Sequence, residues 1–233
     1  MTLPIITIRP EPGCAATVAA GRDAGLAIES WPLFEVRPLA WDAPPADSFD
    51  ALLLGSANAL RHGGAGLGAY RGKPAYAVGD ATGRAAEAAG LELAATGRGV
   101  LQDLIDRQAN LPPRLLRITG AEHVPVTAPQ GVTILTRIAY ESVAQTLPPE
   151  LAERLAGGAL VLLHSAAAAR HFTSECSRPG IVRERIALAA LGPRIAAAAG
   201  DGWRSIRSAE EPREPALLAL AADMCHEAPH ATD

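Results

Sequence analysis

Four short turns in this sequence place small polar residues where a predicted strand gives way to a predicted helix. They read Gly55-Ser56-Ala57-Asn58, Gly79-Asp80-Ala81-Thr82, His164-Ser165-Ala166 and Gly192-Pro193-Arg194. Helix capping alone explains any one such residue, but free N–H groups at helix starts also bind anions. In parallel α/β folds all strands end on one side of the sheet, where ligands bind. Together the turns predict an anion-recognition surface, with these candidate ligands: Ser56, Asn58, Thr82, Ser165 and Arg194.

Two further side chains belong to the same side of the predicted sheets. Arg9 follows the first predicted strand, and its guanidinium is suited to pairing with a carboxylate. A structural surface arginine is the alternative. Tyr140 ends a later predicted strand, where its phenol is placed to donate a proton to a leaving oxygen. A packed tyrosine explains this position equally well.

Other chemistries find little support in the spacing of residues. The glycine run 63–68 does not match the dinucleotide fingerprint and follows a predicted helix, so we expect a loop there. His226 and His230 lie in a C-terminal tail that we expect to be frayed, which argues against zinc. The remaining histidines and the three cysteines show no metal-ligand spacing. We therefore expect no metal site.

The elements that position these residues occur twice. One copy reads FDALLLGSANALR (49–61) followed by KPAYAVGDATGRAAEAAG (73–90). The other reads GALVLLHSAAAARHF (158–172) followed by RIALAALGPRIAAAAG (185–200). Apolar strands that alternate with Ala-rich helices are typical of βαβ units and a parallel sheet. Two copies of one α/β unit predict two lobes with a cleft between them, a favoured place for small-molecule sites.

The distribution of strands predicts how the lobes are assembled. The middle region supplies five strands, near 50–54, 75–78, 91–95, 115–120 and 131–140. The second repeat supplies three, near 159–163, 186–191 and 203–207. It needs two more, and the N-terminal segments at 5–10 and near 26–30 are the obvious candidates.

This assignment gives a discontinuous first lobe and an inserted second lobe. Lobe 1 comprises residues 1–35 and 143–225, and lobe 2 comprises 38–138. The chain crosses at 36–37 and 139–142, where we expect a two-stranded β hinge. Residues 226–233 form the expected flexible tail.

Composition and charge limit the classes of partner. The 233 residues, 48% of them apolar, suffice for two domains of about 100 residues each. No apolar run approaches the ~18 residues of a spanning helix, and the start lacks a signal-peptide pattern. Cys14, Cys176 and Cys225 form no disulfide framework, which fits a reducing cytoplasm. A net charge of −4 argues against nucleic acid and anionic membranes, and no heptad or apolar stripe favours assembly, so we expect a cytoplasmic monomer.

An ordered set of short motifs runs through the chain. It comprises Arg9-Pro10, PLFEV (32–36), FDAL (49–52), YAVGDAT (76–82), Tyr140-Glu141-Ser142 and ALGP (190–193). This set, spread over about residues 5–222, resembles the uroporphyrinogen-III synthase family. The resemblance implies two α/β lobes joined by a two-stranded ladder. It also implies a cofactor-free cytoplasmic lyase of tetrapyrrole, and hence porphyrin and heme, biosynthesis.

The implied reaction closes a linear tetrapyrrole, hydroxymethylbilane, to uroporphyrinogen III. The last pyrrole ring is inverted and water is lost. The substrate carries eight carboxylates on its acetate and propionate arms, so donors spread over a wide surface suit it. By the resemblance, Tyr140 matches a tyrosine proposed to assist departure of the hydroxyl, and Ser56, Thr82 and Ser165 match hydroxyls that contact the substrate.

The resemblance is weaker in the second repeat. The family often has threonine or serine after Gly-Pro, whereas this chain has Arg194-Ile195. We expect Arg194 to replace the hydroxyl by pairing with a carboxylate. His164 and Ala166 also depart from the commoner aromatic-Ser-Pro pattern. These departures leave two non-catalytic alternatives open: a two-lobed cytoplasmic receptor for an anionic small molecule, or a regulatory paralogue that keeps the fold without the activity.

Overall fold

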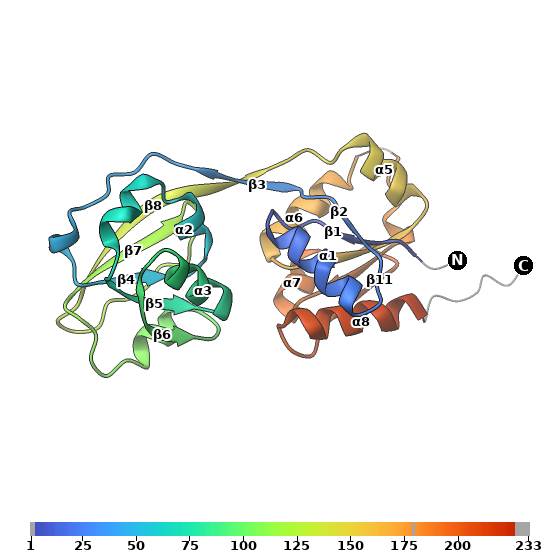
Figure 1. The fold of residues 1–233 in the computed structure, drawn as a ribbon. Coiled ribbons are helices and arrows are strands. Elements are labelled where there is room, and N and C mark those ends of the chain that lie inside the picture. The colour runs from blue at the N-terminus through green and yellow to red at the C-terminus, as the bar shows by residue number, and fades with distance from the viewer. Residues whose placement is uncertain (1–2, 179, 227–233) are drawn as a thin grey trace, which may run out of the picture. The chain divides into compact units, whose positions relative to one another are not determined.

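The computed structural model describes residues 3–178 and 180–226, and its contacts divide the chain into two compact units. Unit 1 comprises Met1–Glu35 and Ala144–Asp233, and unit 2 comprises Val36–Val143. The dark blue N-terminal segment and the yellow to red C-terminal segment lie together in unit 1, and the light blue to yellow-green segments between them form unit 2 (Figure 1). All but the first residue of the predicted tail at 226–233 lies outside the described residues.

Unit 1 contains a five-stranded parallel sheet. The strand order is β2-β1-β9-β10-β11, with every neighbouring pair parallel. The strands are β1 (Ile5–Thr7), β2 (Ile28–Ser30), β9 (Ala159–Leu163), β10 (Ile186–Ala190) and β11 (Ser205–Ser208). The prediction that two N-terminal strands complete the sheet of the second repeat is confirmed, because β1 pairs with β9 and places Ile5 opposite Leu160.

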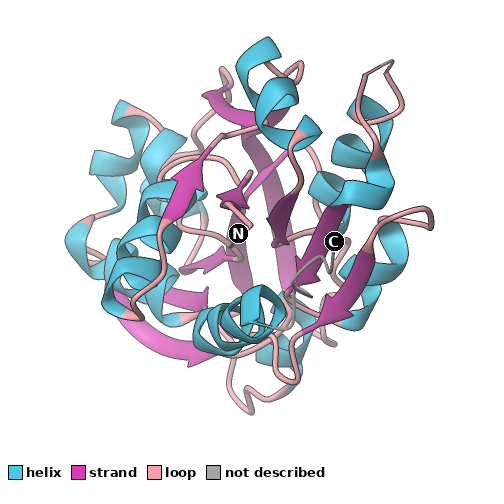
Figure 2. Ribbon diagram, turned by 90° about the vertical axis from the view of Figure 1, so that its right-hand side faces the viewer, coloured by secondary structure: helices cyan, strands magenta, loops and turns pink. Residues whose placement is uncertain are grey.

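Helices cover both faces of this sheet. The helices are α1 (Gly13–Asp23), α5 (Pro149–Ala156), α6 (Ala166–Glu175), α7 (Pro193–Ala198) and α8 (Glu214–His226), with a short 3-10 helix at Arg183–Arg185. Side chains of α5, α6 and α7 pack with Val161 and Leu163 on one face. Those of α1 and α8 pack with Leu160 and Leu162 on the other. Figure 2 shows helices on both sides of the strands. A strand buried on both faces reads as a continuous apolar run, which explains the ALVLL sequence of β9.

Unit 2 contains a six-stranded sheet. Its order is β3-β8-β7-β4-β5-β6, and the five strands from β8 to β6 are parallel. The strands are β3 (Phe34–Pro38), β4 (Ala51–Leu54), β5 (Pro74–Val78), β6 (Glu92–Gly97), β7 (Arg114–Gly120) and β8 (Thr133–Ala144). β3 runs antiparallel to β8, since Leu39 N donates to Ala139 O and Gln145 N donates to Leu33 O, both at 2.9 Å. Both unit boundaries fall within these two strands, and the predicted cleft stays a prediction.

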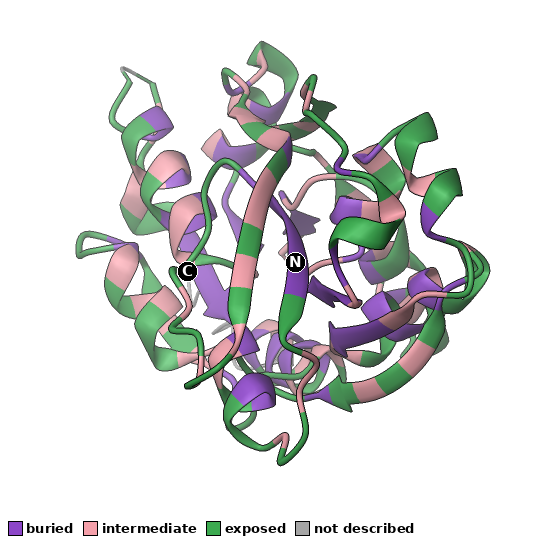
Figure 3. Ribbon diagram, turned by 90° about the vertical axis from the view of Figure 1, so that its left-hand side faces the viewer, coloured by how far each residue is buried: buried purple, intermediate pink, exposed green. Residues whose placement is uncertain are grey.

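The two faces of the unit 2 sheet are covered differently. One carries α2 (Asn58–His62), α3 (Asp80–Ala88) and a 3-10 helix, η2 (Ala65–Tyr70); another 3-10 helix spans Ala46–Ser48. The other carries α4 (Leu101–Asp106) and part of the loop 121–132. Buried residues concentrate in the inner strands β4, β5 and β7, whereas the outer strands are largely green and pink (Figure 3). The run 63–68 was predicted to be a loop but is partly helical, because η2 begins at Ala65 and its last residue, Tyr70, is anchored: the ring is buried and its hydroxyl donates to Pro44 O at 2.8 Å.

The two sheets share one doubly wound topology. In unit 2, β7 and β8 take the places that β1 and β2 occupy in unit 1, and β4, β5 and β6 take those of β9, β10 and β11. The chain winds outward in opposite directions from the central pair, β1 with β9 or β7 with β4. Ligands of such sheets bind beyond the carboxyl ends of that pair, at the switch point. No helix in the described residues is long and apolar enough to cross a membrane.

Candidate functional site

Unit 2 has a cavity of about 310 Å³ at its switch point. Its polar lining comes from the turn after β4, the end of β7, β8, the first turn of α4 and the loop after β7. The polar side chains in this lining are Ser56, Gln102, Arg117, Thr119, Glu122, His123 and Tyr140. The cavity therefore combines hydroxyl, amide and guanidinium donors with one phenol.

Tyr140 owes its position to an irregularity in β8. The register with β7 shifts between Thr119, opposite Ile138, and Gly120, opposite Tyr140. The ring lies close against Gly120, where an added Cβ would stand 2.6 Å from Cε2 of the tyrosine. Within the described part of the chain, no hydrogen bond uses the Tyr140 hydroxyl. The phenol is therefore available to a ligand.

His62 forms an aromatic neighbour of Tyr140. The two ring centroids are 6.2 Å apart with an interplanar angle of 41°. Burial, and then the charge of Arg61, lower the pKa of His62. The imidazole is therefore largely neutral at pH 7, and it meets the phenol as a ring rather than as a cation.

The predicted hydroxyls of unit 2 lie in different environments. Ser56 lines the cavity, and its Oγ accepts a hydrogen bond from Asn58 N at 3.2 Å, which leaves its own proton to donate. Asn58 accepts from Arg61 through Oδ1 at 3.2 Å. Thr82 is buried in the first turn of α3. Neither Asn58 nor Thr82 is part of the cavity lining.

Arg117 is the functional candidate that the sequence reading missed. It lies in the middle of β7 with only 6% of its surface exposed, and its Nη2 donates to Val124 O at 2.7 Å. Its Nε is buried without a hydrogen-bond partner, and no ion pair holds it among the described residues. Burial lowers the pKa of Arg117. The sequence feature that could have identified Arg117 is its position as a charged residue inside the apolar strand LLRITG.

The loop after β7 encloses the cavity from one side. Gln102 holds it from α4, because Thr127 N donates to Gln102 Oε1 at 2.8 Å and Gln102 Nε2 donates to Thr127 O at 3.3 Å. His123 Nδ1 lies 2.9 Å from Gly120 O. This loop takes the place that α1 occupies in unit 1, between the first two strands of the common topology.

The switch point of unit 1 is closed by an internal carboxylate. Glu214, at the start of α8, accepts hydrogen bonds from Thr17 Oγ1 at 2.5 Å and from Arg9 Nη1 at 3.3 Å. His164 Nε2 lies 3.1 Å from the same carboxylate. Burial acts to raise the pKa of Glu214, but His164, Thr17 and Arg9 outweigh it, and the pKa lies below its ordinary value. The guanidinium of Arg9, a predicted substrate ligand, is thus already paired within the protein.

The other predicted ligands of unit 1 lie at helix starts. Ser165 is the N-cap of α6, and its Oγ accepts from Ala168 N at 3.1 Å. Arg194 is exposed in the first turn of α7. Capping thus accounts for the position of Ser165, and the role of Arg194 towards a substrate stays a prediction.

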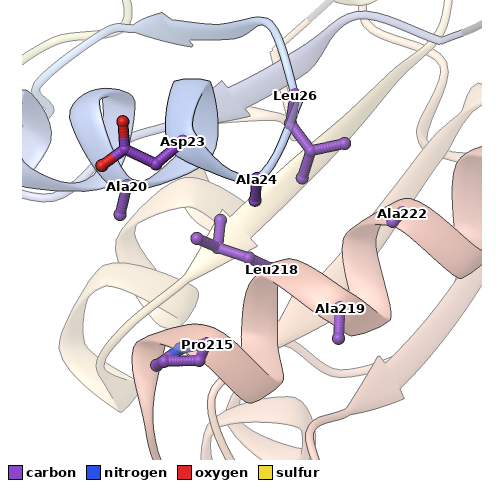
Figure 4. A pocket seen from close by; sticks show the side chains of 8 residues that line it. All are labelled: Ala20, Asp23, Ala24, Leu26, Pro215, Leu218, Ala219 and Ala222. Carbon is purple, nitrogen blue, oxygen red and sulfur yellow. The ribbon is translucent and has the colours of Figure 1, made fainter.

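A second cavity in unit 1 is apolar. It measures about 440 Å³ between α1 and α8, and Asp23 is the only charged residue in its lining (Figure 4). It offers no set of donors for an anion. Across the described residues no group of three or more His, Cys, Asp or Glu side chains is placed to hold a metal ion.

The fold and these sites define a class: an α/β protein of two doubly wound units whose sheets end on polar donors. A family model described as uroporphyrinogen-III synthase HemD matches residues 15–219. The chain therefore belongs to the uroporphyrinogen-III synthase family, and its activity is that of these hydro-lyases of tetrapyrrole biosynthesis.

One solved structure supports this fold. The crystal structure of uroporphyrinogen-III synthetase from Helicobacter pylori is 16% identical, with a TM-score of 0.63, and the match covers 95% of this chain and 99% of that one. A mutant uroporphyrinogen III synthase from Thermus thermophilus is 17% identical, with a TM-score of 0.49 over 96% of this chain and 100% of that one. A search of curated proteins finds no matching sequence.

Proposed function

We propose that this chain closes hydroxymethylbilane to uroporphyrinogen III, inverting the last pyrrole ring, and that the unit 2 cavity holds the reacting end of this substrate. The observation that supports it most is the environment of Tyr140. Its phenol lines a cavity with Ser56 and Thr119 and is free of hydrogen bonds within the described residues. A departing hydroxyl needs a proton donor of this kind.

The departure of the hydroxyl requires little from the protein beyond this proton. Tyr140 donates its proton to the hydroxyl oxygen as the C–O bond breaks, so water leaves and the electron-rich pyrrole becomes an azafulvene. The last ring attacks this azafulvene through its substituted carbon. The older bond from that carbon to the methylene of the third ring then breaks, which gives a second azafulvene, and the unsubstituted carbon of the inverted ring closes onto it. The proton lost from that carbon restores the aromatic pyrrole and, in turn, the phenol. Unaided closure gives the uninverted isomer, so the main task of the protein is to position the chain. We expect no cofactor.

The remaining predicted ligands serve the carboxylates of this substrate. Ser56, Asn58 and Thr82 are expected to contribute from unit 2, and Ser165 and Arg194 from unit 1. Each neutral contact contributes about 0.5–1.5 kcal/mol net, so many weak donors suffice. Arg9 is a special case, because a substrate carboxylate must compete with Glu214 for its guanidinium.

One assay tests the function and the role of Tyr140 together. Freshly prepared hydroxymethylbilane is supplied to the enzyme, and the type III and type I isomers are resolved by chromatography. We expect type III from the wild-type chain, and Tyr140→Phe is expected to slow turnover about tenfold to a few hundredfold, within the range of one proton donor. Type I alone would favour the receptor or regulatory alternatives. An unchanged rate in Tyr140→Phe would remove Tyr140 from the mechanism.

A further inference from the structure

The two switch points of this chain differ in whether their positively charged side chain has a carboxylate partner. In unit 1 the helix that follows the last strand, α8, begins with Glu214, whose carboxylate reaches Arg9 and His164. In unit 2 the corresponding helix, α4, presents Gln102 in its first turn, and this amide is occupied by Thr127 of the loop. Unit 1 thus supplies its own anion, whereas the corresponding helix turn of unit 2 supplies a neutral amide.

The cation of the unit 2 switch point is Arg117. A buried charge is costly unless it is paired, and removing several N–H donors from water adds to that cost. Of the five N–H donors of this guanidinium, Nη2 donates to a backbone carbonyl and Nε has no partner. Glu122 is the one carboxylate in the cavity lining; it is exposed and forms no ion pair with Arg117 within the described residues. The site therefore has a buried positive charge without its counter-charge.

We infer that Arg117 binds a carboxylate of the substrate inside the unit 2 cavity, so that a single carboxylated pyrrole ring lies against Tyr140. The guanidinium fork matches a carboxylate, and Ser56 and Thr119 add hydroxyl donors to the same lining. This assignment rests on the proposed function for the identity of the ligand. The unpaired buried cation itself does not depend on that proposal.

The volume of the cavity sets the size of its occupant. Small-molecule pockets span about 300–1,000 Å³. At about 310 Å³ this cavity lies at the lower end of that range, and it corresponds to roughly ten water molecules at about 30 Å³ each. It accommodates one ring with its arms rather than a linear tetrapyrrole. The ring beside Tyr140 is the one from which the hydroxyl departs, so Arg117 orients that end of the substrate.

The test measures binding of a matched pair of small probes to the full chain. The probes are a monopyrrole that carries one acetate and one propionate arm, and its dimethyl ester, each titrated by calorimetry. We expect Arg117→Met to weaken binding of the acid about tenfold to a hundredfold, the range of hydrogen bonds to charged groups, with less than about a threefold effect on the ester. Arg117→Lys keeps the charge without the fork and should recover part of the loss.

Arg114→Met is the control variant, because Arg114 lies on the same strand but is exposed and pairs with Asp50. We expect it to bind the acid as the wild type does. The inference is overturned if Arg117→Met keeps the wild-type affinity for the acid, or if the wild type binds the acid no better than the ester. Should Arg117→Met fail to fold, Arg117→Lys alone decides, and wild-type affinity in that variant counts against the fork.

The isomer assay separates this inference from the proposed function. A wild type that forms type III, together with Arg117→Met at wild-type kcat/KM, would refute the role of Arg117 and leave the function standing. A wild type that forms only type I, but binds the acid through Arg117, would refute the function and leave the carboxylate site standing.

Discussion

Replacing Gly120 with alanine should impair catalysis by displacing one aromatic ring. The new Cβ would lie 2.6 Å from Cε2 and 2.9 Å from Cζ of Tyr140. Carbon atoms pack comfortably at about 3.5–4.0 Å, so the ring must move by about 1 Å. The backbone of Gly120 does not have the positive φ that would itself exclude alanine. The strain therefore falls on Tyr140 rather than on β7.

A displacement of about 1 Å at a catalytic group can cost about a hundredfold in rate. We therefore expect Gly120→Ala to lower kcat about tenfold to a hundredfold, measured by initial rates on hydroxymethylbilane. The melting temperature should change little, because loss of unfolded-state entropy stabilises a Gly→Ala variant by about 0.4–1 kcal/mol and offsets part of the crowding. Gly68→Ala is the control, since an added Cβ there meets nothing within 4 Å and φ is not positive.

A double-mutant cycle makes this prediction specific. If Gly120→Ala acts through the Tyr140 hydroxyl, it should cost little in a Tyr140→Phe background, because residues in contact give non-additive effects. An equal loss in both backgrounds would show that the alanine acts elsewhere. Wild-type kcat and isomer ratio in Gly120→Ala alone would show that the position of the ring does not limit the reaction.

Two further predictions concern unit 1. Because the folded-state pKa of Glu214 lies below its ordinary value, its carboxylate stabilises the fold above about pH 4.5, and this contribution is lost as pH falls through the lowered pKa. Glu214→Gln should therefore lower the free energy of unfolding by about 1–3 kcal/mol at pH 7, and a deficit that does not shrink in denaturant titrations at acid pH would contradict this linkage. Burial raises the pKa of the Cys176 thiol to about 12, so a thiol reagent should label Cys176 only on unfolding, and rapid labelling of the native protein at pH 7 would contradict the burial.

The fold was readable from the sequence wherever burial on both faces of a strand forces an apolar run. The strand predicted at 159–163 is β9, and the strand predicted near 186–191 is β10 at Ile186–Ala190. The prediction was poorer where a partner far along the chain decides. The antiparallel pair of β3 and β8 was expected as the two-stranded hinge, but its extent was not: β8 was expected to end near residue 140 and continues to Ala144. No local pattern fixes how far such a pairing extends.

The site was only partly readable, and the two arginines at the switch points show why. Arg9 was predicted to bind the substrate because it directly follows a strand, yet it pairs with Glu214, 205 positions away. No role was predicted for Arg117, because it lies inside an apolar strand and the residues of such a strand are expected to be part of the core. The two side chains differ in that the fold brings a carboxylate to Arg9 and, within the described residues, none to Arg117. That depends on the first turn of the helix that follows the edge strand, β11 or β6, where α8 carries Glu214 and α4 carries Gln102.

This contrast also yields an energetic argument for function. A buried arginine without an acidic partner destabilises the fold. Selection for stability alone would therefore replace it, for instance with an apolar residue of similar volume. Functional sites are where such costs persist, because the missing interaction is supplied by the ligand. By the same reasoning the Arg9–Glu214 pair contributes to the stability of unit 1, since each satisfies the other before any substrate arrives, and the role of Arg9 towards the substrate stays a prediction. Substrate charge is therefore expected to be compensated first at Arg117, beside the phenol that donates the proton.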